Sequence, residues 1–222
     1  MSVTRPSSVL FDLDGTLIDT APDFVRCLNV IRKRYGLRAL PEHQIREVVS
    51  EGARAMILLG FDLSPDDEDY FDRHSEFLDL YEDEVAVDTR LFPGMDAVLD
   101  TLEDNGIPWG IVTNKPRRFS VPLLHALHLH DRCDALVCPD DVEHRKPHPE
   151  SLQLACHLMG VSTEGGIYVG DHIRDIEAGR RAGMKTIAAR YGYIQHPGVI
   201  AEWNADIIID SARELEALLT AS

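Results

Sequence analysis

Two aspartates follow a short apolar run near the start of the sequence. Val9–Phe11 has the composition of a buried parallel strand, and Gly15 ends the run at a turn, so Asp12 and Asp14 lie at the strand's carboxyl end. Alternate residues of an extended segment face the same side, and ligands bind beyond the carboxyl ends of parallel strands. The pair could act as a nucleophile and an acid/base group at a magnesium site, whereas the ordinary interpretation is a polar turn.

A calcium-binding loop is a third interpretation of this stretch. A loop of that kind starting at Asp12 needs Gly at its sixth position and Glu at its twelfth, where the sequence has Leu17 and Asp23. The spacing excludes the calcium loop and leaves the nucleophile pair and the polar turn.

Three later apolar runs also end in residues that could bind phosphate or metal. The hydroxyl of Thr113 could hold a phosphate oxygen, and the ammonium of Lys146 could neutralise two anionic groups. The carboxylates of Asp171 and Asp175 could complete a magnesium shell. Singly, each has an ordinary explanation as a helix cap, a loop cation or a turn. The segments concerned are 113–116 (TNKP), 145–147 (RKP) and 170–175 (GDHIRD).

The elements that must position these residues follow from the apolar pattern after Gly94. Strand-like runs alternate with helical segments, which predicts an α/β fold with a Rossmann-like parallel sheet covered on both faces. All the candidate residues would then meet at one edge of the sheet. The strands are expected at 109–112, 135–138, 167–169, 186–189 and 207–209, and the helices near 117–128, 149–160, 174–182 and 212–220.

Residues 20–86 have only helical periodicity. Four helices are expected here, from about residue 20 to Gly36, from Pro41, after Gly52 and over 65–84, with Asp19 or Thr20 capping the first. The segments 17–22 and 88–93 read as connectors. The sequence therefore predicts a core of residues 1–19 and 87–222 with a small all-helical domain, 20–86, inserted after the first strand.

Taken in order, the segments DxDGT, T, K-P and GDxxxD resemble the four motifs of the haloacid-dehalogenase-like phosphatases. The resemblance spans nearly the whole chain, and it makes the helical insertion a cap over the site. It implies that Asp12 is the nucleophile and Asp14 the general acid/base. By the same resemblance, phosphate is contacted by Thr16, Thr113, Asn114 and Lys146, and Mg²⁺ is held by Asp12, Asp14 and Asp171, with Asp175 supporting these ligands. His172 departs from the residues usual after Gly-Asp, and its role stays open.

The implied reaction is hydrolysis of a phosphate monoester through an aspartyl-phosphate. The relatives that cleave carbon–halogen bonds lack the second aspartate, so Asp14 favours phosphate chemistry. Two rivals remain open. A sugar-phosphate mutase shares the core and cap but often has another residue in place of Thr16, and a catalytically idle relative would act as a binding module.

Within this family, the sequence is similar to the phosphoglycolate-phosphatase-like branch. Residues 48–56, 109–119 and 190–194 are most similar to the bacterial N-acetylmuramic acid 6-phosphate phosphatases, which act in recycling of cell-wall sugars. Muramic acid phosphate and phosphoglycolate both carry a carboxylate besides the phosphate. Arg54, in the expected cap helix, is the candidate cation that would bind this carboxylate. The alternative is that Arg54 is a solvated helix residue.

Composition limits the possible partners. The formal charge is 22 minus 38, or −16, which argues against binding to nucleic acid or anionic membrane. No apolar signal region or membrane-length stretch is present, so we expect a cytoplasmic enzyme for a small phosphate ester, as a monomer or homodimer. The cysteines lack metal-site spacing and are expected to be reduced, mostly buried thiols: Cys27, Cys133, Cys138 and Cys156.

Overall fold

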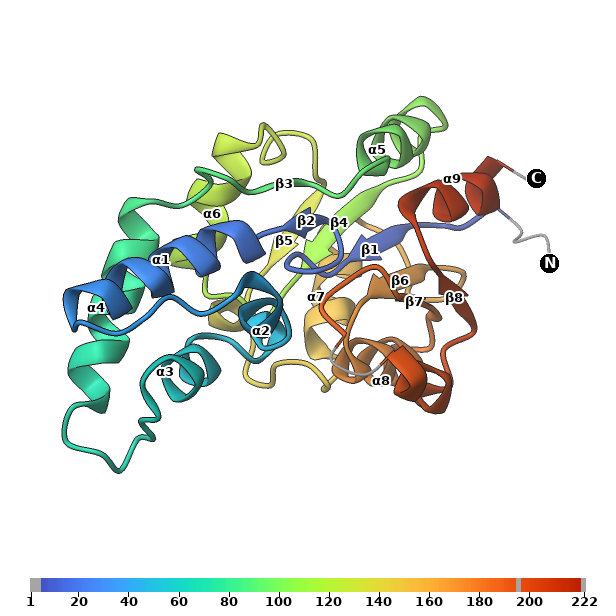
Figure 1. Cartoon of the computed structure of the whole chain (residues 1–222). Helices are drawn as coiled ribbons and strands as arrows, with labels where there is room; N and C mark the ends of the chain where they lie inside the picture. The colour runs from blue at the N-terminus through green and yellow to red at the C-terminus, as the bar shows by residue number, and fades with distance from the viewer. Residues whose placement is uncertain (1–4, 195–196, 221–222) are drawn as a thin grey trace.

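A six-stranded parallel sheet forms the centre of the protein, and it confirms the predicted α/β fold (Figure 1). The computed structural model describes residues 5–194 and 197–220. The strand order is β5-β4-β1-β6-β7-β8, so β1 lies between β4 and β6 and Val9 pairs with both Trp109 and Ile167. The strands are β1 (Val9–Phe11), β4 (Trp109–Val112), β5 (Ala135–Val137), β6 (Ile167–Gly170), β7 (Lys185–Ala189) and β8 (Ile207–Ile209).

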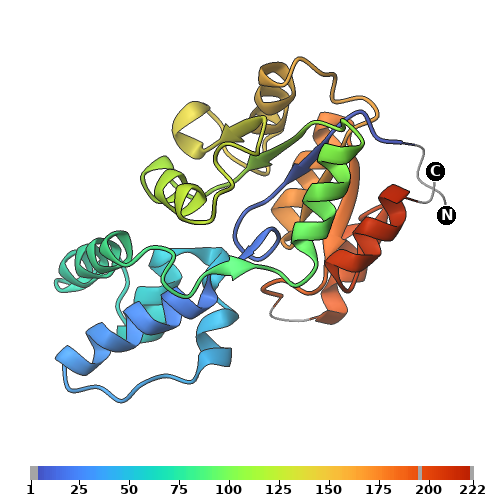
Figure 2. The ribbon, with the colours of Figure 1, turned by 90° about the horizontal axis from the view of Figure 1, so that it is seen from above.

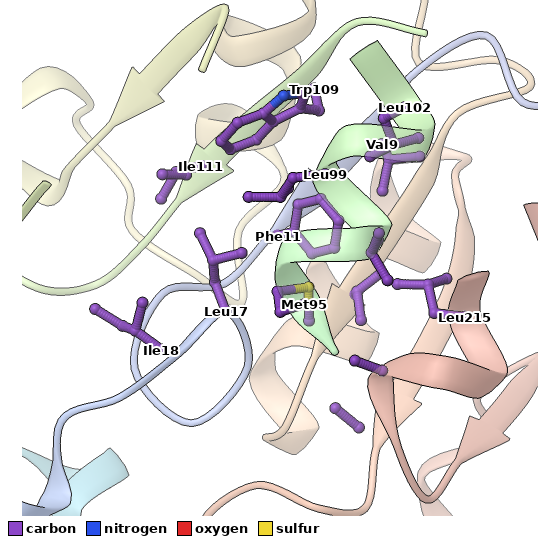
Figure 3. Close-up of a cluster of buried hydrophobic side chains, with 14 of the residues drawn as sticks. Val9, Phe11, Leu17, Ile18, Met95, Leu99, Leu102, Trp109, Ile111 and Leu215 are labelled. Atoms are coloured by element: carbon purple, nitrogen blue, oxygen red, sulfur yellow. The ribbon is translucent and has the colours of Figure 1, made fainter. Parts of the chain in front are cut away.

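Successive residues of a strand point to opposite faces of the sheet. Here the residues on both faces are apolar, and helices cover both faces. Val9 and Phe11 pack in the cluster under α5 and α9, shown in Figure 3, whereas Leu10 belongs to the cluster under α7 and α8. The core helices are α5 (Met95–Asp104), α6 (Arg117–Ala126), α7 (Glu150–Leu158), α8 (Ile173–Ala182) and α9 (Ala212–Thr220). Because both faces are buried, the polar residues that follow the strands are confined to the sheet's edge.

The helices of residues 21–83 form a separate group beside the sheet edge (Figure 2). They share a hydrophobic cluster in which Phe24 and Tyr81 stack with ring centroids 4.4 Å apart. The division into core and cap at residues 19/20 and 86/87 stays a prediction, because this cluster also includes Phe92, Phe119 and Tyr193 of the predicted core. The helices are α1 (Ala21–Arg34), α2 (Glu42–Arg46), the 3-10 turn η1 (Val49–Glu51), α3 (Ala53–Phe61) and α4 (Tyr70–Asp83).

The two connectors between these parts are paired with each other. β2 (Ile18–Asp19) and β3 (Arg90–Leu91) form an antiparallel ribbon, where the sequence suggested only linkers. The buried carboxylate of Asp23 accepts hydrogen bonds from the backbone and hydroxyl of Thr89, which ties α1 to the returning chain. Asp19 Oδ1 accepts a hydrogen bond from the backbone N–H of Ala21, in the first turn of α1. The Thr20 hydroxyl donates a hydrogen bond to Asp14 and does not cap the helix.

The cysteines are free thiols, as expected, with Cys133 half-buried and the other three buried. Over the described residues, no helix has both the length and the apolar character needed to cross a membrane. The cytoplasmic location and the monomeric or homodimeric state stay predictions.

Candidate active site

A cavity of about 680 Å³ lies where the carboxyl ends of the strands face the cap helices. It brings together residues from segments that are far apart in the sequence. Residues of the core that line it include Asp12, Asp14, Thr113, Asn114, Lys115, Arg145, Lys146 and Arg174, and residues of the cap include Phe24, Glu51, Arg54, His74 and Tyr81. The predicted residues Thr16, Asp171 and Asp175 are not in this lining, and Asp171 lines a smaller cavity of about 190 Å³ that shares Glu51 and His172 with it.

Lys146 joins the predicted nucleophile to the helix that follows β6. Its Nζ lies 2.9 Å from Asp12 Oδ1 and 2.8 Å from Asp175 Oδ1, and it also donates to the backbone oxygen of Val112 and to the Tyr168 hydroxyl. Burial disfavours the ammonium, but the two carboxylates outweigh it and raise the pKa of Lys146. Lys146 is therefore a fixed cation beside Asp12.

Three carboxylates lie close together, and Lys146 contacts two of them, Asp12 and Asp175. Oxygens of Asp12, Asp171 and Asp175 all lie within 4.8 Å of one another. Burial raises the pKa of Asp12 to about 6, and burial together with the charges of Asp12 and Asp175 raises that of Asp171 to about 8. The three carboxylates thus outnumber the Lys146 ammonium that contacts them, and their oxygen donors suit a hard divalent cation such as Mg²⁺.

Asp175 is engaged on both of its oxygens. Oδ1 accepts from Lys146 and from the Tyr168 hydroxyl, and Oδ2 accepts from the backbone N–H of His172 at the start of α8. Gly170 makes this position possible, because a Cβ there would lie 2.3 Å from Asp175 Cβ. The geometry supports the predicted role of Asp175 in supporting the other ligands.

Asp171 is held by the turn after β1 and by the segment that follows β7. Thr16 Oγ1 donates to its Oδ1 at 3.1 Å, and the backbone N–H of Tyr193 donates to its Oδ2 at 2.8 Å. Gly15 has φ of 84°, and a Cβ on it would lie 2.2 Å from Asp171 Oδ2. Thr16 is fully buried, so the structure favours positioning of Asp171 over the predicted contact with phosphate.

Asp14 has a partner that the sequence interpretation missed. Its Oδ1 accepts from Thr20 Oγ1 at 2.6 Å and from Lys115 Nζ at 2.9 Å. The buried Lys115 ammonium also lies 4.8 Å from the Phe24 ring centroid and 4.7 Å from that of Tyr81, both in the cap. The only signal available was a lysine directly after Thr-Asn at a strand end.

Thr113 and Asn114 lie at the carboxyl end of β4, where they were predicted to contact phosphate. Both line the cavity. Thr113 Oγ1 accepts from the backbone N–H of Lys115, and Asn114 Nδ2 donates to the backbone oxygen of Lys146. The loop after β4 is thus joined to the loop that carries Lys146.

The cap reaches the same edge through the turn η1. His172 Nε2 lies 3.0 Å from Glu51 Oε1, and the Arg174 guanidinium donates to the backbone oxygen of Ser50. His172, whose role the sequence left open, therefore links the core to the cap. Arg54 lines the cavity with an exposed side chain that has no hydrogen-bond or ion-pair partner among the described residues.

Comparison with known proteins decides the family. The sequence pattern of the family described as "Haloacid dehalogenase-like hydrolase" matches residues 9–189. The chain belongs to the haloacid dehalogenase-like hydrolase family. This membership confirms the resemblance drawn from the four motifs, and the match includes β1, the cap and every strand of the sheet up to β7.

Individual relatives of this hydrolase are similar over nearly their full length. A Pseudomonas aeruginosa protein named "N-acetylmuramic acid 6-phosphate phosphatase" is 46% identical over 97% of this chain and 95% of its own. A Xanthomonas campestris protein named "Phosphoglycolate phosphatase" is 39% identical over 95% of each. The crystal structure of a predicted phosphoglycolate phosphatase from Haemophilus somnus is 26% identical, has a TM-score of 0.84 and covers 98% of this chain and 99% of that one.

Proposed function

We propose that this haloacid dehalogenase-like hydrolase removes phosphate from N-acetylmuramic acid 6-phosphate. The observation that carries the proposal is the cavity itself, which has the Lys146-bound carboxylate of Asp12 in its core part and, in its cap part, Arg54, which has no partner among the residues that the structure describes. A substrate with a phosphate at one end and a carboxylate at the other matches this arrangement of charges. The Pseudomonas relative is named for that substrate.

The residues divide the chemistry between them. Asp12 in its ionised form attacks phosphorus and forms an aspartyl-phosphate, while Asp14 donates a proton to the leaving alkoxide. Asp14 then takes a proton from the water that attacks the aspartyl-phosphate and releases inorganic phosphate. Lys146 stabilises the charge on Asp12 and on the phosphoryl oxygens throughout.

The acidic cluster fits a magnesium ion. Asp12 and Asp171 would hold it together with the backbone carbonyl of Asp14, and Asp175 would support them. Bound there, Mg²⁺ supplies positive charge that lowers the repulsion between the nucleophile and the phosphoryl group. The raised pKa values of Asp12 and Asp171, caused first by burial and then by neighbouring carboxylates, support this assignment, because a bound cation would stabilise the ionised forms.

Phosphoglycolate is the second candidate substrate, since the Xanthomonas relative is named for it. A two-carbon acid would leave most of a 680 Å³ cavity unfilled, and its carboxylate is attached close to the phosphate. A muramic acid bears its carboxylate on a lactyl ether, farther from the phosphate. The size of the cavity therefore favours the amino sugar.

The test is a comparison of kcat/KM in MgCl₂ for N-acetylmuramic acid 6-phosphate, phosphoglycolate, glucose 6-phosphate and a nucleotide. We expect the muramic acid ester to be hydrolysed at least about 10-fold more efficiently than the others. An equal or higher value for phosphoglycolate would assign the protein to that substrate instead. Excess chelator should abolish hydrolysis of all four.

A further inference from the structure

A second group of metal-binding side chains lies on the loop that carries Lys146. His144, His148 and Glu150 each offer one ligand atom, and these atoms lie within 4.8 Å of one another. Glu150 Oε2 is 3.1 Å from His144 Nδ1 and 3.7 Å from His148 Nδ1. Two ligands of a tetrahedral Zn²⁺ ion are roughly 3.3 Å apart, given bonds of about 2.0 to 2.2 Å. The spacing is therefore close to that of a zinc site.

We propose that His144, His148 and Glu150 form a surface site for a divalent transition-metal ion of the Zn²⁺ type. Two imidazoles and one carboxylate are a ligand set that suits Zn²⁺, Ni²⁺ and Cu²⁺, whereas Mg²⁺ prefers oxygen ligands alone. Water would complete the coordination, since the three side chains are exposed or half-buried. The proposed site is independent of the phosphatase assignment.

The loop already holds these side chains in place. Glu150 accepts hydrogen bonds from the backbone N–H groups of Glu143 and His144, at 2.9 and 3.0 Å. A carboxylate oxygen has enough lone pairs to keep such a bond and also bind a metal ion, and bonds of this kind orient ligands in metal sites. The two imidazole centroids are 4.7 Å apart. His148 Nδ1 accepts a long hydrogen bond of 3.4 Å from the Glu150 backbone N–H, and an ion that binds this nitrogen would replace that bond.

The turn between the two histidines contains the active-site lysine. His148 N–H donates to the backbone oxygen of Arg145, closing a turn with Lys146 inside it. Lys146 is buried and faces the cavity, while His144 and His148 are exposed. An ion that bridges His144 and His148 would therefore stabilise the loop that positions Lys146, without contact with the substrate.

The test is Zn²⁺ binding by the full-length, chelator-treated protein in excess MgCl₂, which occupies the oxygen cluster at Asp12 and Asp171. Competition with a chromophoric chelator counts the bound ions. We expect the wild type to bind one Zn²⁺ more than the double variant His144→Gln/His148→Gln. We also expect Zn²⁺ at about 100 times its Kd to raise the wild-type Tm by about 5 to 10 °C, and that of the variant by less.

The chain offers a matched control in a second histidine pair. His125 and His130 stack with ring centroids 3.9 Å apart. Within the described part of the chain, no third metal-binding side chain lies close to both of them. His125→Gln/His130→Gln should bind as many ions as the wild type. Equal Zn²⁺ binding by the wild type and His144→Gln/His148→Gln would overturn the proposal, as would loss of the ion in the control. If the double variant does not fold, His148→Gln alone should lose the ion, and its retention would equally refute the site.

Discussion

Lys115 Nζ and Asp14 Oδ1 are joined by an ion pair of 2.9 Å at the boundary between core and cap. The lysine follows β4, the aspartate follows β1, and the rings of Phe24 and Tyr81 that face the ammonium belong to the cap. Lys115 and Thr20 both bind Oδ1, and no described residue binds the second oxygen of Asp14, so that oxygen is left for proton transfer. Lys115 is therefore inferred to position the acid/base group.

Replacing Lys115 by Met should slow the hydrolysis of substrates whose leaving group needs a proton. A charge-assisted hydrogen bond contributes about 1.5 to 3 kcal/mol, so kcat/KM on an alkyl phosphate such as the sugar ester should fall about 10- to 150-fold. The value of kcat/KM on p-nitrophenyl phosphate should change little, because this quantity covers only the steps up to formation of the aspartyl-phosphate and p-nitrophenolate leaves without protonation. Lys33→Met, at an exposed position of α1, is the control. Equal losses of kcat/KM on both substrates would show that Lys115 does not act through proton donation by Asp14.

Asp12→Asn should abolish turnover because an amide does not attack phosphorus. We expect kcat on p-nitrophenyl phosphate to fall by more than about 100-fold, since loss of a general base alone costs about 10²- to 10⁴-fold. The substitution also removes one charge from a crowded acidic cluster, so the metal-free variant should melt no lower than the wild type. Retention of more than about a hundredth of kcat would exclude Asp12 as the nucleophile.

The metal-free protein should lose stability as the pH rises. Folding raises the pKa of Asp12 from 3.8 to about 6 and that of Asp171 from 3.8 to about 8. Between the unfolded and folded values the native state holds more protons than the unfolded state, so the free energy of unfolding decreases with pH in this window. Thermal unfolding in chelator should show a lower Tm above pH 8 than near pH 6, and MgCl₂ should restore more stability at the higher pH.

Asp171→Asn separates this effect from that of the histidines. Burial lowers the pKa of His74 and of His172, and these groups make stability increase with pH below their ordinary value of 6.5. The difference in Tm between the wild type and Asp171→Asn, followed against pH, gives the contribution of the Asp171 carboxylate to stability. A wild-type Tm that decreases no more with pH than that of the variant would contradict the assignment of a cation-deficient cluster.

The sheet and the residues at its edge were predictable because they depend on local sequence. Buried strands appear as apolar runs, and each run ends in polar residues, so Asp12, Thr113 and Asp171 could be placed at one edge before the structure was known. The β2–β3 ribbon could not be predicted, because a strand of two residues is too short to show an alternation of apolar and polar residues. The partner of Lys115 lies 101 residues away, a contact that only the fold creates.

Arg54→Ala should affect the proposed substrate alone. Arg54 lines the cap side of the cavity, and nothing in the described chain occupies its guanidinium, so it is available to pair with the substrate carboxylate. Loss of such a pair should lower kcat/KM on N-acetylmuramic acid 6-phosphate by about 10- to 150-fold. Hydrolysis of p-nitrophenyl phosphate, which has no carboxylate, should be nearly unchanged.

Two further variants show whether this effect belongs to Arg54. Arg38→Ala removes an exposed arginine of the cap that does not line the cavity, and it should leave both substrates unaffected. Arg118 lines the cavity but has Glu82 as a partner 3.7 Å away, so Arg118→Ala should cost less on the sugar phosphate than Arg54→Ala. Because a structural role for Arg54 would slow every substrate, equal losses on the sugar ester and on p-nitrophenyl phosphate would remove Arg54 from the recognition of the carboxylate.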